Sequence, residues 1–204
     1  MSKRSYFERF HLNTKELHQK GFTILHQVFD IEPDILENLT KQVRTRGNTI
    51  FGADKKRKQC SISCRSKKVR QFKSTLNEMI HEIIISTHPN YEQGDWVILR
   101  SLENSKRQHP HHDYIPSQKL KKCPNEEFPL GVICSLMSET KLNVWIDGKE
   151  EIANLNGGDI LVFRGDFTHA GSAYEKENIR LHCYIDNVMI PRTPNRTHIV
   201  NVKE

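Results

Sequence analysis

Residues 158–185 read GDILVFRGDFTHAGSAYEKENIRLHCYI, and this stretch decides the fold of the chain. It contains two short runs rich in branched and aromatic residues, 160–163 and 179–185, separated by turn residues. Runs of this kind are typical of β-strands. Similar runs lie at 96–100, 130–136 and 142–146. The dipeptide Asp147-Gly148 between two strand-like runs predicts a hairpin, and we expect a β core of many short strands.

The part of the chain before the β core shows helical patterns instead. Asn13 followed by Glu16 fits a capping box, and Gly21 is a plausible stop for the helix between them. Pro33 opens a second run with apolar residues at helical spacing. A third amphipathic run covers residues 72–84. Helices followed by many short strands predict an α+β domain.

Two further segments complete this layout. Residues 22–25 read as a short strand, whereas residues 47–70 carry Gly, Ser and many charges and predict a long loop. At 204 residues the chain is expected to form one domain. The expected layout of domain 1–204 is a helical part (1–93) with a basic loop (44–73), a β-barrel core (94–190) and a tail (191–204).

The composition bears on where in the cell the protein is located. No apolar run is long enough to cross a bilayer, and the first ten residues lack the apolar stretch of a secretory signal. The five cysteines are an odd number without the spacing of a disulfide scaffold. Cys60 and Cys64 lack a second ligand pair at a usual distance, which disfavours a zinc knuckle. We therefore expect a cytoplasmic protein without a membrane partner.

The net charge of +6 is concentrated in one segment. Residues 44–73 contain eleven Lys or Arg and a single acid, Asp54. Such a patch favours an acidic protein segment or a nucleic acid as partner, although a solvated mobile loop is an equally good interpretation. Aromatic residues are sparse there, which disfavours single-stranded nucleic acid. Residues 55–58 also resemble a nuclear import signal.

Three residues form a candidate metal site. Side chains two apart in a strand project to the same face, so His111 and Asp113 point together while His112 points away. His169 follows a strand and a Gly-Asp turn, from which it can complete the set. Two histidines and one carboxylate leave positions open on the ion, as suits non-haem Fe(II).

An arginine and a glutamine extend this site. Arg180 lies within the apolar run 179–185, where burial is costly unless the guanidinium is paired. A bound dicarboxylate would supply a bidentate partner, and an ion pair with Asp186 is the alternative. Gln108, just before the His-x-Asp triplet, is expected to support the cosubstrate or the ligand shell.

These residues resemble the Fe(II)- and 2-oxoglutarate-dependent dioxygenases, whose pattern is His-x-Asp, a distal His and then an Arg about one strand later. His111, Asp113, His169 and Arg180 fall on this pattern in order. The N-terminal layout is similar to the phytanoyl-CoA hydroxylase-like branch. The resemblance implies a double-stranded β-helix, a jelly-roll barrel, with the N-terminal helices packed against it. It also implies a hydroxylase that uses O2 and converts 2-oxoglutarate to succinate, with Arg180 on the distal carboxylate.

The sequence departs from the family pattern at two places. Many members have Ser or Thr two residues after the arginine, where this chain has His182. His109 and His111 also form a His-x-His, as in the cupins, but no Glu follows in the right place. Two alternatives therefore remain open: a cupin-like metal-binding protein, and a basic interaction module on the same barrel without oxygenase activity.

Overall fold

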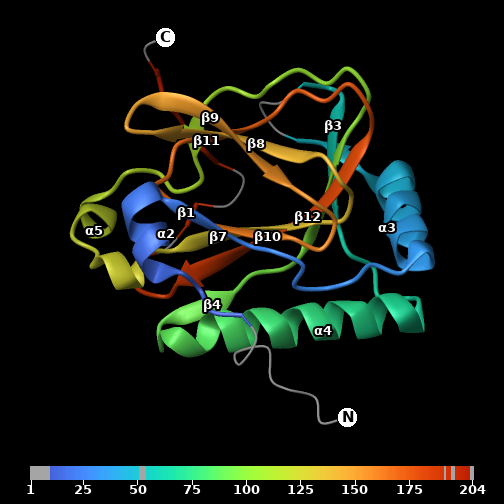
Figure 1. The fold of residues 1–204 in the computed structure, drawn as a ribbon, viewed down its shortest axis with the longest axis horizontal. Helices are drawn as coiled ribbons and strands as arrows, with labels where there is room; N and C mark the ends of the chain where they lie inside the picture. The colour runs from blue at the N-terminus through green and yellow to red at the C-terminus, as the bar shows by residue number, and fades with distance from the viewer. Residues whose placement is uncertain (1–9, 51–53, 191, 194–195, 203–204) are drawn as a thin grey trace.

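A computed structural model describes residues 10–50, 54–190, 192–193 and 196–202, and the start of the chain considered for a signal lies outside these residues. Two antiparallel sheets face each other, and helices cover the outer side of the larger sheet (Figure 1). No helix in the described part is long and apolar enough to cross a membrane.

The larger sheet has eight strands and the smaller has five. The larger sheet runs in the order β1 (Phe22–Leu25), β10 (Ile160–Arg164), β7 (Leu130–Ser135), β12 (Asn178–Asn187), β5 (Val97–Ser101), β3 (Arg57–Ser61) and β2 (Asn48–Thr49), with β4 (Tyr91–Gln93) paired to β12. The smaller sheet runs in the order β13 (His198–Ile199), β6 (His111–His112), β11 (His169–Gly171), β8 (Thr140–Ile146) and β9 (Lys149–Leu155). The helices are α2 (Thr14–Lys20), α3 (Pro33–Arg46), α4 (Lys67–Ile83), α5 (Gln118–Lys121) and the 3-10 turns η1 (Ile85–Thr87) and η2 (Asn125–Glu127).

Local signals explain the first helix as predicted. The side chain of Asn13 accepts a hydrogen bond from the backbone N–H of Glu16 at 3.0 Å, which satisfies one of the free donors at the start of α2. Gly21 ends α2 in the left-handed conformation, with φ of 86°. A Cβ atom at Gly21 would lie 2.2 Å from the ring of Phe167, so the position needs glycine for space as well.

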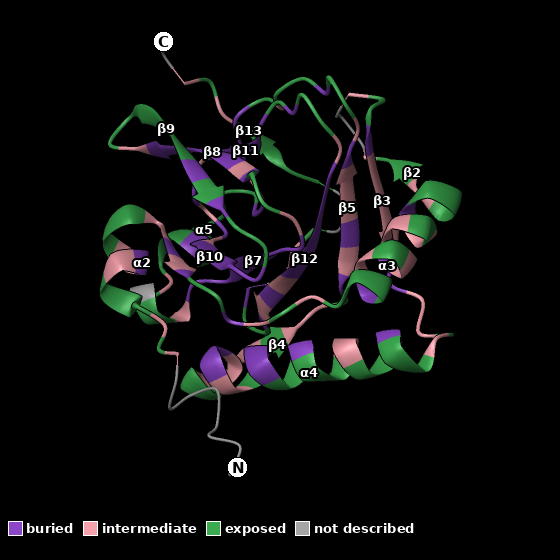
Figure 2. Cartoon of the chain, turned by 45° about the vertical axis from the view of Figure 1, so that its right-hand side comes forward, coloured by how far each residue is buried: buried purple, intermediate pink, exposed green. Residues whose placement is uncertain are grey.

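β12 is buried along most of its length (Figure 2). Its side chains alternate between two faces and so divide the interior into two layers. Ile179, Leu181 and Ile185 pack against α3 and α4 in the larger apolar cluster. Arg180 and His182, whose side chains project to the opposite face, line a cavity between the sheets. A second apolar cluster joins the two sheets beside that cavity; its buried members are Ile133, Leu142, Val144, Ala153, Leu155, Leu161, Phe163 and Phe167.

The expected long loop over residues 47–70 is wrong. This segment holds β2 and β3, and α4 begins at Lys67 rather than near residue 72. β3 is paired on both edges, with Gln59 opposite Leu99 of β5. Lys56 is exposed and Arg57 is buried. The charges concealed the strand because β3 places buried Arg57 and half-buried Lys58 on opposite faces.

The expected division at residue 94 also differs from the structure. The part before it contributes β1, β2, β3 and β4 to the larger sheet, so it is not simply a helical layer. The expected tail likewise contains β13, in which Ile199 pairs with His111 of β6. β1 agrees with the strand expected at residues 22–25. The strands β2, β3, β4 and β13, of two to five residues, need partners distant in sequence, which explains why local patterns did not predict them.

Candidate metal centre and anion site

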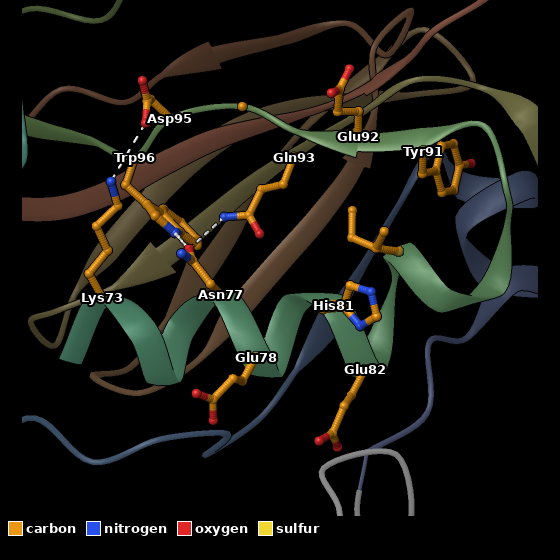
Figure 3. Close-up of a pocket in the computed structure, with 12 residues that line it drawn as sticks. Lys73, Asn77, Glu78, His81, Glu82, Tyr91, Glu92, Gln93, Asp95 and Trp96 are labelled. Carbon is orange, nitrogen blue, oxygen red and sulfur yellow. Dashed lines mark hydrogen bonds and ion pairs between the residues drawn. The ribbon is translucent and has the colours of Figure 1, made fainter. Parts of the chain in front are cut away.

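Two hollows of similar size lie on opposite sides of the larger sheet. The outer one, of about 570 Å³, runs between α4 and β4 (Figure 3). Its polar groups largely satisfy one another: Asn77 Oδ1 accepts hydrogen bonds from Trp96 Nε1 at 2.8 Å and from Gln93 Nε2 at 2.9 Å. Lys73 pairs with Asp95 at 3.5 Å. None of the predicted site residues lies there.

The inner cavity, of about 630 Å³, lies between the two sheets and collects the predicted residues. Its lining includes Gln108, His111, Asp113, His169 and Arg180. Further lining residues are Ile50, Gln59, Leu99, His109, Ile115, Ile133, Leu142, Phe163, Gly171, His182, Tyr184, Arg196, Thr197 and Ile199. An apolar wall with a few converging polar groups is the usual form of a small-molecule site.

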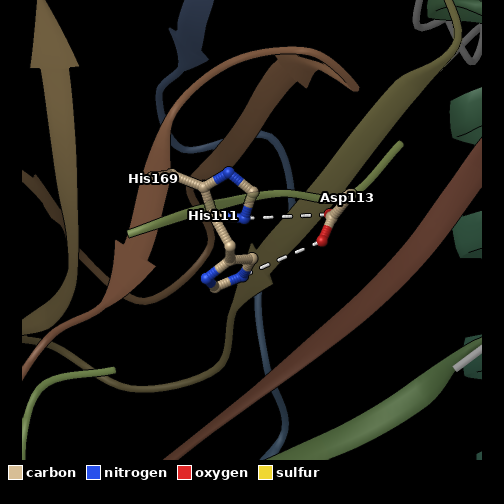
Figure 4. Close-up of side chains that lie close together, drawn as sticks. All are labelled: His111, Asp113 and His169. Atoms are coloured by element: carbon tan, nitrogen blue, oxygen red, sulfur yellow. Dashed lines mark ion pairs between the residues drawn. The ribbon is translucent and has the colours of Figure 1, made fainter. Parts of the chain in front are cut away.

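His111, Asp113 and His169 converge at one point of this cavity (Figure 4). His111 of β6 and His169 of β11 are directly opposite in the strand register. The Nε2 atoms of His111 and His169 lie 3.9 and 3.8 Å from the carboxylate of Asp113. One ligand atom from each residue falls within 4.8 Å of the other two, and all three residues are buried. The spacing is suitable for a shared metal ion.

Backbone carbonyls fix the orientation of both imidazoles. Nδ1 of His111 lies 2.7 Å from the carbonyl oxygen of His109, and Nδ1 of His169 lies 3.0 Å from that of Phe167. A carbonyl oxygen only accepts, so each Nδ1 carries the proton. In the neutral rings Nε2 then presents its lone pair toward Asp113. This is the tautomer that a metal ligand requires, so the donor set fits a ferrous ion.

Burial and neighbouring rings shift the pKa of two members of the cluster, His169 and Asp113. Burial lowers the pKa of His169 to about 4, so this imidazole is neutral at pH 7. Burial alone would raise the pKa of Asp113, but the adjacent rings of His169, His182 and His111 hold it below its ordinary value. The site therefore presents the neutral imidazole of His169 and the carboxylate of Asp113, deprotonated forms that bind metal.

A third histidine faces the same carboxylate. His182 of β12 places Nε2 3.8 Å from Asp113, and its ring meets that of Tyr184 edge-on at 4.5 Å. Burial lowers the pKa of His182 to about 4. The sequence left its role open. The structure places His182 beside the three-residue cluster and two residues from Arg180 on the same face of β12.

Two neighbouring histidines, His109 and His112, lie apart from the cluster. His112 points to the opposite face and hydrogen-bonds through Nε2 to Thr168 Oγ1 at 2.8 Å. His109 contributes its carbonyl oxygen to His111 while its imidazole stays outside the cluster. Gln108 ties this segment to β11, because its Oε1 accepts from the N–H of Gly171 at 3.1 Å.

Arg180 is only 3% exposed and has no acidic partner among the described residues. Its NH1 donates to Ser101 Oγ at 3.2 Å and to Asn178 Oδ1 at 3.4 Å. The alternative ion pair with Asp186 is wrong, because that carboxylate accepts from Arg192 at 3.0 Å. Within the described part of the chain, Nε and NH2 of Arg180 have no acceptor, which leaves one edge of the guanidinium for a carboxylate.

Arg57 is a second buried arginine at this site, and sequence reasoning missed it. It is 0% exposed and donates to the backbone carbonyls of Lys106 and Gly171 at 2.7 and 3.0 Å. Its NH1 also donates to Ser101 Oγ at 3.1 Å. No sequence signal marked it: the structure shows that Arg57 shares its face of β3 with Gln59, which lines the cavity.

Comparison with known proteins gives a fold but no family. No family model matches the sequence, and no curated protein matches it. Several solved structures do match. A prolyl-4-hydroxylase from Pseudomonas putida has a TM-score of 0.63 at 13% identity, over 85% of this chain and 96% of that one.

Two further structures agree. The epimerase SnoN, solved with Fe3+ and alpha ketoglutarate, has a TM-score of 0.64 at 12% identity, over 93% of this chain and 86% of that one. A Trichoplax adhaerens prolyl hydroxylase, in complex with a hypoxia inducible factor peptide, has a TM-score of 0.63 at 10% identity, over 85% and 87% of the two chains. At these identities the likeness establishes a shared fold of helices and antiparallel sheets.

Proposed function

We propose that this chain is an Fe(II)- and 2-oxoglutarate-dependent oxygenase that hydroxylates its substrate and converts 2-oxoglutarate and O2 to succinate and carbon dioxide. His111, Asp113 and His169 would hold the ferrous ion, and Arg180 would hold the distal carboxylate of 2-oxoglutarate. One observation carries the proposal: a buried arginine without an acidic partner lines the same cavity as a buried two-histidine, one-carboxylate cluster.

The same proposal assigns the architecture. The two facing antiparallel sheets with the cluster between them support a double-stranded β-helix, and the structures of similar fold include enzymes solved with iron or nickel and 2-oxoglutarate. The helix, strand and Pro-led helix at the start of the chain support the phytanoyl-CoA hydroxylase-like branch as the finer placement.

Some residues of the chain would bind the metal and the cosubstrate, and others would exclude water from the site. A bound ferrous ion with 2-oxoglutarate supplies the activation of O2. The carbonyls of His109 and Phe167 keep the two metal-binding nitrogens unprotonated. Phe163, fully buried and 4.6 Å from the ring of His169, shields the centre from solvent. Gln108 would keep the strand that carries His111 in place against β11.

The substrate is proposed at the level of its class, as an acidic segment of a larger molecule, with a protein segment favoured over a nucleic acid. Ile50 and Gln59 of the β2–β3 region line the cavity, so the basic segment borders it. Arg196 adds a positive charge to the lining. Ile115 and Ile199, at 41% and 55% exposure, supply apolar surface beside that charge.

The structure of residues 55–58 bears on the location of the protein, for which we propose the cytoplasm. Residues 55–58 resemble an import signal in sequence, but an import signal must be accessible as an extended peptide. The side chain of Arg57 is buried, and β3 is paired on both edges. These contacts disfavour a nuclear import role for this run.

The test is production of succinate from 2-oxoglutarate by the full chain with Fe(II), screened against peptide, nucleic-acid and small-metabolite pools. Substrate-dependent succinate that is lost in Asp113→Ala and kept in His112→Ala would support the proposal. Metal binding that survives Asp113→Ala but is lost in His109→Ala would favour the cupin-like alternative instead.

A further inference from the structure

One member of the metal cluster is not held in place by strand pairing. His111 and His169 lie opposite each other in β6 and β11. β6 ends at His112, however, and Asp113 lies in the bend that follows. The carboxylate of Asp113 lies beside both imidazoles, so contacts outside the sheet must fix the backbone at this position. The next residue, Tyr114, supplies these contacts.

Tyr114 is fixed at its backbone and at its ring. Its N–H donates to the carbonyl oxygen of Gly165 at 3.0 Å. Tyr114 is 2% exposed and its ring packs directly on Gly165, where a Cβ atom would lie 2.2 Å from the ring. Gly165 belongs to the turn that leads to His169. Tyr114 therefore ties the backbone beside Asp113 to the turn before His169.

The hydroxyl of Tyr114 continues these contacts into the larger sheet. It donates a hydrogen bond to Asp186 Oδ1, near the end of β12. Burial and the Asp186 carboxylate raise the pKa of Tyr114, so the hydroxyl remains a donor. Asp186 also accepts from Arg192, whose Nε lies 3.0 Å from Oδ1 and whose NH2 lies 3.4 Å from Oδ2. A hydroxyl, a carboxylate and a guanidinium thus form one hydrogen-bonded chain.

Arg192 is also close to the metal cluster. Its guanidinium carbon lies 3.7 Å from the centroid of the Tyr184 ring. That ring lines the cavity together with Asp113 and meets the ring of Tyr114 edge-on at 6.2 Å. Burial would raise the pKa of Asp113, and Arg192 is among the charges that, after three neighbouring histidines, hold this pKa below its ordinary value. Arg192 therefore acts on the contacts of Tyr114 and on the charge of the Asp113 carboxylate.

We propose that Tyr114, Asp186 and Arg192 form a latch that positions Asp113 to bind the metal ion. All three are positioning residues, because the metal cluster itself consists of Asp113 and two histidines. The latch makes the segment after β12, which contributes Arg192, a part of the metal site. The inference rests on the proposed function, because it assumes that Asp113 binds a metal ion.

A purely structural role for these residues makes a different prediction. Tyr114→Phe keeps the ring on Gly165 and the backbone hydrogen bond, and it leaves Asp186 paired with Arg192. If the three residues only stabilise the fold, the folded variant binds metal with the wild-type affinity and ligand geometry. If they form the latch, the folded variant binds metal more weakly and with an altered ligand geometry.

The experiment is a calorimetric titration of the metal-free full chain with Co(II). The visible absorption of the Co(II)-saturated protein is the second readout, because its bands report the ligand geometry. The variants are Tyr114→Phe, Arg192→Met and the two combined. Tyr91→Phe is the matched control, since it removes a tyrosine hydroxyl that donates to the carbonyls of Glu126 and Phe128 at 3.0 and 2.9 Å. Thermal unfolding of each variant reports whether it is folded.

We expect Tyr114→Phe to weaken Co(II) binding by about tenfold or more, the usual effect of losing a contact that orients a metal ligand. The visible bands at saturation should shift in the same variant. Adding Tyr114→Phe to Arg192→Met should weaken binding by less than about a further threefold, because both changes act through Asp186. Tyr91→Phe should match the wild type in affinity and in spectrum.

Folded Tyr114→Phe with the wild-type affinity and spectrum would overturn the inference. An equal loss of affinity in Tyr91→Phe, or fully additive losses in the double variant, would overturn it as well. Should Arg192→Met not fold, Tyr114→Phe still decides the question.

Asp113→Ala separates this inference from the proposed function. If this variant binds Co(II) as tightly as the wild type, the proposed metal site itself fails. If Asp113→Ala loses Co(II) binding while Tyr114→Phe keeps it, only the latch fails.

Discussion

Arg180→Met tests whether this arginine serves the fold or a ligand. In the ligand-free protein the substitution removes hydrogen bonds to Ser101 and Asn178, at 3.2 and 3.4 Å. At about 1 kcal/mol each, these losses total roughly 2 kcal/mol. Removing a buried charge without an acidic partner regains a similar or larger amount, and it also ends the repulsion with Arg57. We therefore expect the free energy of unfolding to change by no more than about 1 kcal/mol.

Ligand binding should respond very differently to the same change. The free edge of the guanidinium can give a carboxylate two charge-assisted hydrogen bonds, each worth about 1.5–3 kcal/mol. Losing both costs at least about 3 kcal/mol, which is roughly a hundredfold in the dissociation constant of 2-oxoglutarate.

The assay combines urea denaturation of the ligand-free protein with calorimetric titration of 2-oxoglutarate into the Fe(II) form without oxygen. A structural arginine behaves in the opposite way, since breaking a buried ion pair costs about 3–5 kcal/mol. A loss of that size in Arg180→Met, together with wild-type affinity for 2-oxoglutarate, would refute the reasoning.

Three further outcomes follow from the site. Asp113→Ala should weaken Fe(II) binding by more than about a hundredfold in equilibrium dialysis. His112→Ala is the matched control, and an equal loss of Fe(II) affinity in both variants would contradict the ligand set. Because the pKa of His169 falls from 6.5 to about 4 on folding, the metal-free protein should lose stability as the pH falls from 7 to 4. His169 alone contributes up to roughly 3 kcal/mol of this loss in urea denaturation, and His182, whose pKa falls likewise, adds to it. A flat profile would contradict this. A Cβ at Gly171 would lie 2.3 Å from Gln108 Oε1. Gly171→Ala should therefore destabilise the fold by about 1–3 kcal/mol. An unchanged melting temperature in this variant would contradict the contact.

The sequence predicted the cluster because its signal was local. The separation of two between His111 and Asp113 is the one that strand alternation requires, although β6 itself ends at His112 and Asp113 lies in the bend that follows. His169 required only the expectation that a turn returns the chain to that strand, and the register confirms that the two histidines are opposite. Arg180 was found from the cost of burying a charge in an apolar run, and the structure removes the alternative partner Asp186.

Arg57 and β3 could not be predicted in the same way. Lysine and arginine are equally polar in any hydropathy pattern, so the alternation of buried Arg57 with half-buried Lys58 left no trace in the sequence. The burial of Arg57 depends on carbonyl groups of Lys106 and Gly171, which are distant in the chain and meet β3 only after the sheets form. Burial of a charged residue is decided by such tertiary acceptors, not by the residue's neighbours in sequence.

The most direct test of the central claim is anaerobic visible absorption of the purified chain during addition of Fe(II) and then 2-oxoglutarate. The account predicts a weak charge-transfer band that requires both additions in the wild type. It also predicts that the band is absent in Asp113→Ala and, at the same 2-oxoglutarate concentration, strongly reduced in Arg180→Met. A wild-type protein that shows no band, or a band of unchanged intensity in Arg180→Met, would contradict the joint iron and 2-oxoglutarate site.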